Sequence, residues 1–232
     1  HYPLRRQRQM CIRDSINFEG VAILKVALVF LLAAFFFKIA AFPFHMWSPD
    51  VYEGAPTSTT VFFANVPKIA ALTFFVRLLV FSFSNFVMLW QSLVLFAAVG
   101  SIVYSSFVAL KQDSLKRLLA YSGIGHGGFL LLPLASNTIE GVQALFFYIL
   151  VYMLTSLPVW GVVLACMGGK PHSQTSIPIL AGLPNASPFL AFLGALAFLS
   201  HAGIPPLAGF YSKVFVFFSA IKSSFYFIAF LT

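Results

Sequence analysis

The chain has 232 residues, of which 60% are hydrophobic and 9% are charged, and its formal net charge at pH 7 is +8. Soluble domains average roughly 25% charged residues, so this composition excludes an ordinary soluble enzyme or binding module. The hydrophobic residues form long runs without alternation, which indicate membrane-spanning helices and not the strands of a membrane barrel. A strongly basic chain can indicate a nucleic-acid partner. Here many basic residues lie near the N-terminus or beside the apolar runs, so no nucleic acid is expected.

Residues 1–15 differ in character from the rest of the chain, because they are polar and rich in arginine. They lack the apolar core of a signal peptide. We interpret them as a foreign or disordered extension, and we expect residues 16–232 to form a partial transmembrane domain that is truncated at both ends. Cys11 and Cys166 lie in different contexts and indicate neither a metal site nor a disulfide framework.

Hydropathy predicts an all-α integral membrane protein with about six transmembrane helices and a truncated seventh, each complete span being close to the ~20 residues that a bilayer needs. The expected spans cover residues 21–42, 57–81, 86–110, 118–135, 141–167 and 188–220, and a seventh begins at residue 223. A proline inside a helix removes a backbone hydrogen bond and clashes with the preceding turn. We therefore expect the first span to be discontinuous at Pro43 and the sixth at Pro205-Pro206.

The two expected breaks resemble each other. Pro43 follows Lys38 by five residues, and Pro205 follows His201 by four. Two broken helices separated by about 160 residues suggest internal repeats, the pattern of repeat-built transporters.

The basic loop at residues 111–117 predicts the side of the membrane. Lysine and arginine favour the inner side, so the loop between the third and fourth spans is expected there. The loop that carries Asp50 and Glu53 should lie on the same side, where solvated or interhelical ion-pair roles are expected. Arg77 is expected to anchor the opposite end of the second span at the interface.

Five titratable residues inside the spans are the candidate functional residues: Lys38, Lys68, His126, His201 and Lys213. A lysine at membrane depth costs roughly 2.5–3.5 kcal/mol on insertion scales. Each lysine alone could extend to the interface, but three at mid-depth favour a functional role. His126 lies among glycines, so helix packing explains it as well as proton transfer does. The adjacent break favours a functional role for His201.

Proton transfer is the chemistry that fits these residues. Burial disfavours the charged form of a lysine and a nearby carboxylate favours it, so a lysine held between both effects can take up and release a proton. Histidine can relay protons near neutral pH. The sequence contains no bis-histidine haem pair, cysteine cluster or dinucleotide-binding glycine pattern, so no redox cofactor is expected on this chain.

Three sequence blocks resemble the family of subunit N of bacterial NADH–quinone oxidoreductase, whose mitochondrial counterpart is subunit 2 of respiratory complex I. They are FKIAAFPFHMWSPDVYEGAPT at residues 37–57, KQDSLKRLLAYS at 111–122 with the following Gly125-His126, and AGIPPLAGFYSK at 202–213. The resemblance covers about residues 20–232 and implies an antiporter-like repeat bundle, of which this chain would hold the seventh to twelfth helices and the start of the next.

By this resemblance, Lys38, Lys68 and Lys213 match the lysines of the family's broken seventh, eighth and broken twelfth helices, and His126 matches a histidine of the tenth. The glutamate that pairs with Lys38 would lie in the fifth helix, outside this chain. The resemblance implies no cofactor on this chain. NADH, FMN, the iron–sulfur clusters and quinone would be bound on or between other subunits.

The leading hypothesis is a proton-translocating membrane subunit of complex I, an enzyme to which this chain would add no redox site. Its partners would be other membrane subunits, the lipid bilayer and protons. Its location would be the bacterial plasma membrane or the mitochondrial inner membrane. The alternative is a subunit of a multi-subunit cation/proton antiporter, which shares the fold. The motif VYEGAP and the lysine of the second span favour complex I. A third possibility is a purely structural subunit.

Overall fold

The structure is a computed structural model that describes residues 18–167, 176–223 and 225–226. The expected extension at residues 1–15 lies outside the described residues, as does most of the seventh span.

The described residues form helices and contain no β-strand, which confirms the all-α prediction. The helices are α2 (Phe18–Ile39), α3 (Trp47–Gly54), α4 (Thr57–Arg77), α5 (Val87–Ala109), α6 (Leu115–Ala135), α7 (Ile139–Met167), α8 (Leu183–Ala186), α9 (Pro188–Ala202) and α10 (Ala208–Lys222). A π-helical turn at Leu78–Ser82 extends α4, and 3₁₀ turns occupy Ser84–Phe86 and Ile177–Gly182.

Among the described residues, five of the six predicted spans correspond to single stretches that are long and apolar enough to cross a membrane; these contain helices α2, α4, α5, α6 and α7. The predicted sixth span corresponds to two shorter helices, α9 and α10, which are separated between residues 202 and 208. The expected boundaries of all six spans agree with the structure to within three residues. This accuracy has a physical reason, because backbone groups in a bilayer must be paired internally and a long apolar run leaves only the helix to do so.

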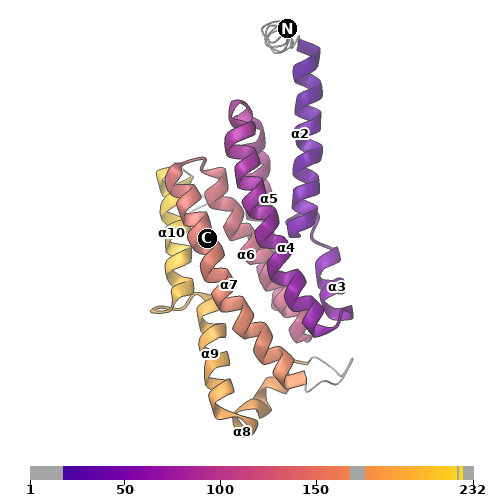
Figure 1. The fold of residues 1–232 in the computed structure, drawn as a ribbon, viewed down its shortest axis with the longest axis vertical. Coiled ribbons are helices and arrows are strands. Elements are labelled where there is room, and N and C mark those ends of the chain that lie inside the picture. Colours follow the sequence, from indigo (N-terminus) through magenta and orange to yellow (C-terminus); the bar gives the residue numbers. More distant parts are fainter. Residues whose placement is uncertain (1–17, 168–175, 224, 227–232) are drawn as a thin grey trace, which may run out of the picture.

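Helix α6 is the most enclosed of the long helices. In the apolar stretch of α6 that could cross a membrane, 78% of the residues are buried, whereas in that of α2 only 22% are buried. Figure 1 shows α2 at one edge of the bundle and α10 at the opposite edge. The glycines of α6 let neighbours approach: a Cβ added at Gly128 would lie 2.7 Å from the carbonyl oxygen of Ala98 on α5. Close packing through small residues is typical of helices in membranes.

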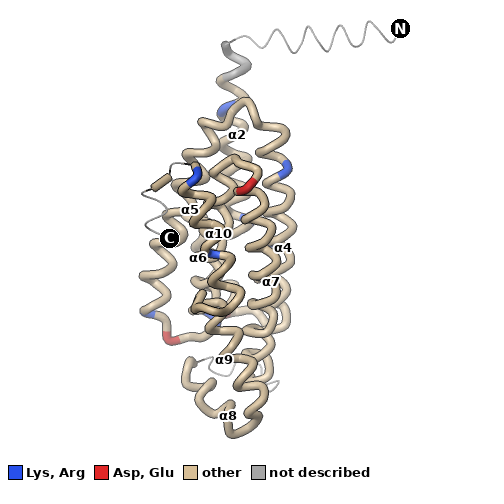
Figure 2. The backbone as a smooth tube through the Cα atoms, turned by 90° about the vertical axis from the view of Figure 1, so that its left-hand side faces the viewer, with Lys and Arg blue, Asp and Glu red and all other residues tan. Residues whose placement is uncertain are grey.

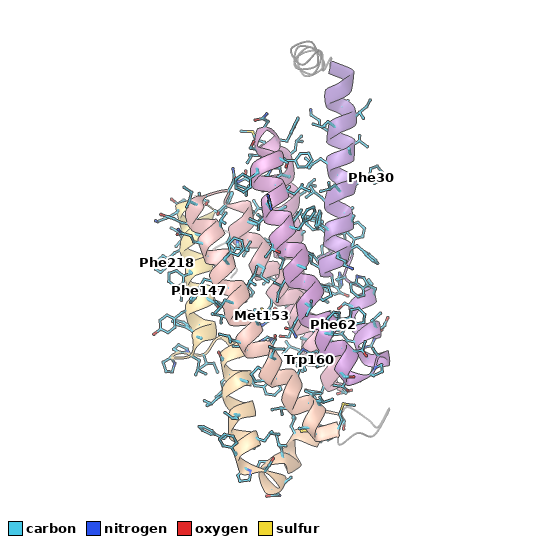
Figure 3. All side chains as sticks on the ribbon, viewed as in Figure 1. Phe30, Phe62, Phe147, Met153, Trp160 and Phe218 are labelled. Carbon is cyan, nitrogen blue, oxygen red and sulfur yellow. The ribbon has the colours of Figure 1, made fainter. Side chains whose placement is uncertain are left out.

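The described residues expose many large apolar side chains, and charged residues are sparse along the bundle (Figure 2). Phe30 and Phe62 are labelled in Figure 3 and are 72% and 54% exposed, as expected of side chains that face lipid. At one end of the bundle, Arg117 of α6 pairs with Asp50 of α3 at 2.7 Å and with Glu53 at 3.4 Å. These pairs confirm the interhelical ion-pair role expected for the two carboxylates.

The first break, residues 40–46, separates α2 from α3. Ala40 adopts a left-handed backbone conformation with φ of 58°, and the Phe42–Pro43 peptide bond is cis. The backbone N–H of Phe42 donates to the hydroxyl of Ser101 on α5 at 2.8 Å. The indole N–H of Trp47 donates to the carbonyl oxygen of Phe37 at 2.9 Å, which satisfies one of the unpaired carbonyls at the end of α2.

The second break, residues 203–207, has the same plan. Gly203 is left-handed with φ of 86°, and the Pro205–Pro206 bond is cis. The backbone N–H of Gly209 donates to the hydroxyl of Ser200 at 3.2 Å.

One detail differs from the sequence interpretation of the breaks. Pro43 lies three residues after the left-handed Ala40, and Pro206 lies three residues after the left-handed Gly203, so Pro43 corresponds to Pro206 and not to Pro205. Both His201 and Lys38 then precede their proline by five residues. Two consecutive prolines left this choice open in the sequence.

Candidate functional site

Lys68 is buried in the middle of the bundle. Its side chain is on α4, one residue after Pro67, and the residue is 4% exposed. Its ammonium group donates to the carbonyl oxygen of Gly123 on α6 at 3.1 Å and lies 5.8 Å from the ring centre of Tyr52. A Cβ at Gly123 would lie 3.0 Å from the lysine nitrogen, so a glycine makes room for this contact. Among the described residues no carboxylate contacts Lys68.

His126 follows Gly123 by one turn of α6. Its Nδ1 atom lies 2.7 Å from the hydroxyl of Tyr148 on α7. Its ring centre lies 4.0 Å from that of His201 and 5.4 Å from that of Tyr152. His126 therefore has a hydrogen bond to Tyr148 and a ring contact with a second imidazole, an arrangement that both the packing and the proton-transfer interpretations allow.

His201 occupies the last turn of α9, directly before the second break. Its Nδ1 atom lies 3.3 Å from the hydroxyl of Thr155 on α7. The Thr155 hydroxyl also lies 3.0 Å from the carbonyl oxygen of Val151 and 3.2 Å from that of Tyr152, to which it donates. Because the Thr155 hydroxyl proton is used in these bonds, its oxygen accepts a hydrogen bond from the imidazole of His201. Neutral His201 then carries its proton on Nδ1. The Nε2 atom of His201 is then a proton acceptor.

Lys213 lies on α10 and reaches back across the second break. Its ammonium donates to the carbonyl oxygen of Ala202 at 2.8 Å, at the end of α9. The negative end of a helix favours a cation there. The same nitrogen lies 5.2 Å from the ring centre of Phe129 on α6.

These contacts form a row along α6. Gly123, His126 and Phe129, spaced three residues apart, contact Lys68, His201 and Lys213 in that order. Six residues of helix span about 9 Å. The structure thus gathers four of the five predicted residues along two turns of the most enclosed helix.

Lys38 is the exception. It lies in the last turn of α2, is exposed, and makes no hydrogen bond or ion pair with the described residues. It shares an exposed face with Ile23, Phe30 and Phe37, which are spaced seven residues apart and are 54–72% exposed. The sequence predicted that Lys38 lies at mid-depth with the other lysines, and among the described residues Lys38 contacts no member of the row along α6.

Sequence reasoning missed three polar residues on one face of α7: Tyr148, Tyr152 and Thr155. Their spacing of four and three residues within an apolar span was the available signal. Among the described residues, no group of three or more His, Cys, Asp or Glu side chains is placed to hold a metal ion.

Known proteins resemble this chain over nearly its whole length. A sequence model of the family described as NADH:quinone oxidoreductase/Mrp antiporter, TM, matches residues 13–232. NADH-quinone oxidoreductase subunit N 1 of Rhizobium meliloti (strain 1021) is 44% identical over 216 residues, which cover 93% of this chain and 45% of that protein. This chain thus spans less than half of the length of that relative.

Solved structures agree. A chain of respiratory complex I from Thermus thermophilus with bound aureothin matches with a TM-score of 0.74 and 32% identity, over 89% of this chain and 45% of that one. A chain of the Mrp complex from Dietzia sp. DQ12-45-1b matches with a TM-score of 0.77 and 19% identity, over 92% of this chain and 39% of that one. The second likeness concerns the fold alone. The expected resemblance to subunit N and the antiporter-like fold are both confirmed.

Proposed function

Because the chain belongs to the NADH:quinone oxidoreductase/Mrp antiporter transmembrane family, we propose that it carries part of the proton path in a membrane subunit of NADH–quinone oxidoreductase, complex I. The observation that supports this most is the row along α6, where Lys68, His126, His201 and Lys213 follow one another inside an apolar bundle. Uncompensated titratable groups at membrane depth are costly and mark ion or proton pathways.

The four residues have distinct roles in this proposal. Lys68 carries a proton as an ammonium group that donates to the Gly123 carbonyl oxygen. His126 and His201 pass protons between imidazoles whose centres are 4.0 Å apart. Lys213 binds or releases the proton at the second break, beside the carbonyl oxygen of Ala202. Lys38 is proposed to exchange protons with a group outside the described residues, because its side chain faces away from the row.

In this assignment the chain contributes to the enzyme without a redox site of its own. NADH, FMN, the iron–sulfur clusters and quinone are placed on or between other subunits, which are the partners of this chain in an energy-transducing membrane. Electron transfer would drive protons along the row through changes in charge or position at its ends.

The decisive experiment replaces Lys68 in the full-length subunit within the assembled complex. Removal of a positioned proton carrier typically costs 10²–10⁴ in the proton-transfer step, so Lys68→Ala should lower proton pumping at least about tenfold. Pumping is followed with a pH-sensitive dye in vesicles, and NADH oxidation is measured in parallel. Lys111→Ala, an exposed lysine of the loop before α6, is the matched control and should pump normally.

The same experiment separates the alternatives. If Lys68→Ala pumped the normal number of protons per electron at a normal rate, the relay would be wrong. If the variant lowered the amount of assembled complex but not pumping per complex, the chain would be a structural subunit. A cation/proton antiporter would instead support growth in high sodium with no effect on NADH oxidation.

A further inference from the structure

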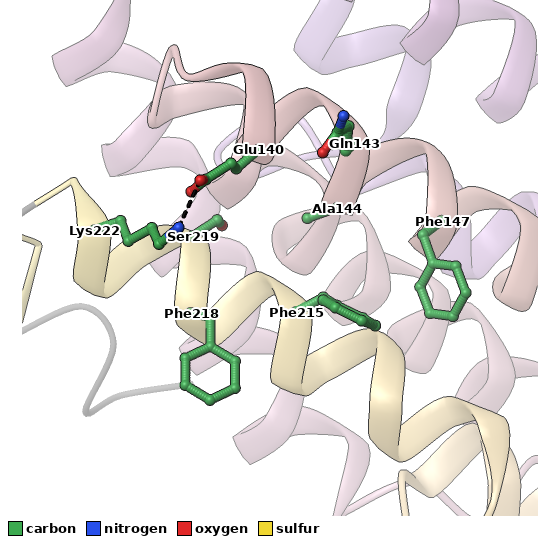
Figure 4. Close-up of a pocket in the computed structure, with 8 residues that line it drawn as sticks. All are labelled: Glu140, Gln143, Ala144, Phe147, Phe215, Phe218, Ser219 and Lys222. Carbon is green, nitrogen blue, oxygen red and sulfur yellow. Dashed lines mark hydrogen bonds and ion pairs between the residues drawn. The ribbon is translucent and has the colours of Figure 1, made fainter.

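A groove with a volume of about 480 Å³ runs between α7 and α10, away from the row along α6. Its lining residues, drawn in Figure 4, are Glu140, Gln143, Ala144, Phe147, Phe215, Phe218, Ser219 and Lys222. The small side chains of Ala144 and Ser219 are buried and leave room between the helices, while the three phenylalanines are exposed. A concave, mostly apolar site of this size is suited to part of a lipid, such as the headgroup and the upper part of one acyl chain.

The polarity of the groove changes along its length. Glu140 is in the first turn of α7 and Lys222 is in the last turn of α10, so both lie at the same end of this helix pair. Phe147 and Phe215 are each seven residues further into their helices, about 10 Å deeper at 1.5 Å per residue. Their ring centres are 5.1 Å apart. Charge at this end and aromatic rings two turns deeper match the order of headgroup and acyl chain in a phospholipid.

The charged end carries one cation and one anion. The Lys222 ammonium contacts a carboxylate oxygen of Glu140 at 2.5 Å, and the two side chains are 61% and 52% exposed. An ammonium group has three donors and a carboxylate accepts at two oxygens, so both keep capacity for a ligand. A headgroup that bears a phosphate and a primary amine complements this pair, because the phosphate can accept from Lys222 and the amine can donate to Glu140.

We propose that this groove binds one bilayer phospholipid with an ethanolamine headgroup, its phosphate on Lys222, its amine on Glu140 and an acyl chain along Phe147 and Phe215. The site is independent of the proton path and stands whether or not that path is correct.

A second groove provides an internal contrast. It has a volume of about 560 Å³ at the end of α4 and is lined by Phe74, Arg77, Leu78, Phe81 and Ser82. Here a cation lies beside aromatic rings without a carboxylate among the lining residues. A phospholipid phosphate fits this groove too, but nothing in its lining favours an amine over a quaternary ammonium group.

The test uses the full-length subunit in its complex, placed in phosphatidylcholine nanodiscs. Two probes with the same photoactivatable acyl chain are compared, one phosphatidylethanolamine and one phosphatidylcholine. After illumination, labelled peptides are identified by mass spectrometry. The ethanolamine probe should label the peptides that contain residues 140–147 and 215–222 several-fold more than the choline probe, and unlabelled phosphatidylethanolamine should compete.

Three variants test which residues give the preference for the ethanolamine probe over the choline probe. Glu140→Gln should remove the preference for ethanolamine, about tenfold, since it removes one charge-assisted hydrogen bond. Ala144→Leu should fill the groove and abolish labelling by both probes while the ion pair is retained. Arg77→Gln, at the second groove, should leave labelling of α7 and α10 unchanged.

Equal labelling by the two probes in the wild type, or a preference that survives both Glu140→Gln and Ala144→Leu, would mean contact with bulk lipid and would overturn the proposal. Absence of label on α7 and α10 would mean that protein covers the groove, and this too would overturn it.

Discussion

The two helix breaks share one backbone plan and differ in where they place positive charge. Each has a left-handed residue, a cis proline three residues later and a serine hydroxyl that accepts a backbone N–H. At the first break a neutral indole, that of Trp47, caps the end of the half-helix, and Lys38 points away from the bundle. At the second break the cap is the ammonium of Lys213, and His201 lies against His126.

The difference shows that the break itself is a scaffold and that its chemistry is set by the side chains placed on it. The second break forms its polar contacts with α6, α7 and α10, so its titratable groups are linked within the described residues. The first break holds its backbone groups equally well but leaves its lysine available to another neighbour. Four predictions test this contrast, from the largest expected effect to the smallest.

Packing at the second break should be the least tolerant of added volume. A Cβ at Gly209 would collide with the backbone carbonyl oxygen of Ser200, whereas a Cβ at Gly100, beside the first break, would meet the ring of Phe42 at 2.5 Å. Backbone cannot yield as a ring can, so Gly209→Ala should lower the free energy of unfolding by about 3 kcal/mol and Gly100→Ala by about 1. Reversible unfolding of the full-length subunit in mixed micelles measures both. Equal losses would contradict the contrast.

Substitutions of the two side chains that donate to the helix ends, Lys213 and Trp47, should affect different properties. Lys213→Gln keeps a hydrogen-bond donor but loses the charge, so pumping by the complex should fall about tenfold or more with the fold retained. Trp47→Phe removes the donor at the first break, which should cost about 1 kcal/mol of stability and leave pumping normal. Dye-monitored pumping and thermal unfolding of each complex give the two readouts. Loss of pumping in Trp47→Phe alone would reverse the assignment.

The hydroxyl of Tyr148 should matter at the second break, because it contacts His126 at 2.7 Å. Tyr148→Phe removes one hydrogen bond worth about 1 kcal/mol, which corresponds to about fivefold in the population of the correctly oriented imidazole. Pumping should fall by up to that factor at unchanged assembly. The neighbouring Phe146→Tyr, at a position of α7 that is 46% exposed, serves as a control for aromatic changes on this helix. An unaltered pumping rate in Tyr148→Phe would remove the residue from the path.

Backbone strain should be larger at the first break than at the second, which is the reverse of the packing contrast. Ala40 is left-handed without being glycine, whereas Gly203 is glycine at the same place in the other break. A left-handed residue with a Cβ costs roughly 1 kcal/mol, so Ala40→Gly should stabilise the subunit by up to about this amount and Gly203→Ala should destabilise it. Thermal unfolding of the two variants measures both changes in stability. Destabilisation by Ala40→Gly would show that the Ala40 methyl group contributes packing that outweighs its strain.

Much of the fold followed from the sequence because the bilayer restricts the choice. Apolar length fixed six spans, and proline fixed two breaks, since both act locally along the chain. The choice between Pro205 and Pro206 did not follow, because adjacent prolines give the same local signal.

The candidate site followed only in part. Lys68 and His201 could be selected from burial cost and from the neighbouring break. The contact of His126 with Tyr148, and the outward direction of Lys38, depend on how α2, α6 and α7 are rotated about their axes. Nearly uniform apolar faces do not specify that rotation, so residues such as Thr155 became visible only in three dimensions.

The enclosure of α6 has a consequence for time scales. An amide hydrogen in the middle of this helix exchanges with solvent only when its hydrogen bond opens and water enters the bundle. In the proposed proton path, a proton also needs water to reach His126. The deuterium uptake of the amides from Gly123 to Phe129 therefore reports hydration of the row, and the proposed path predicts faster uptake while the complex turns over.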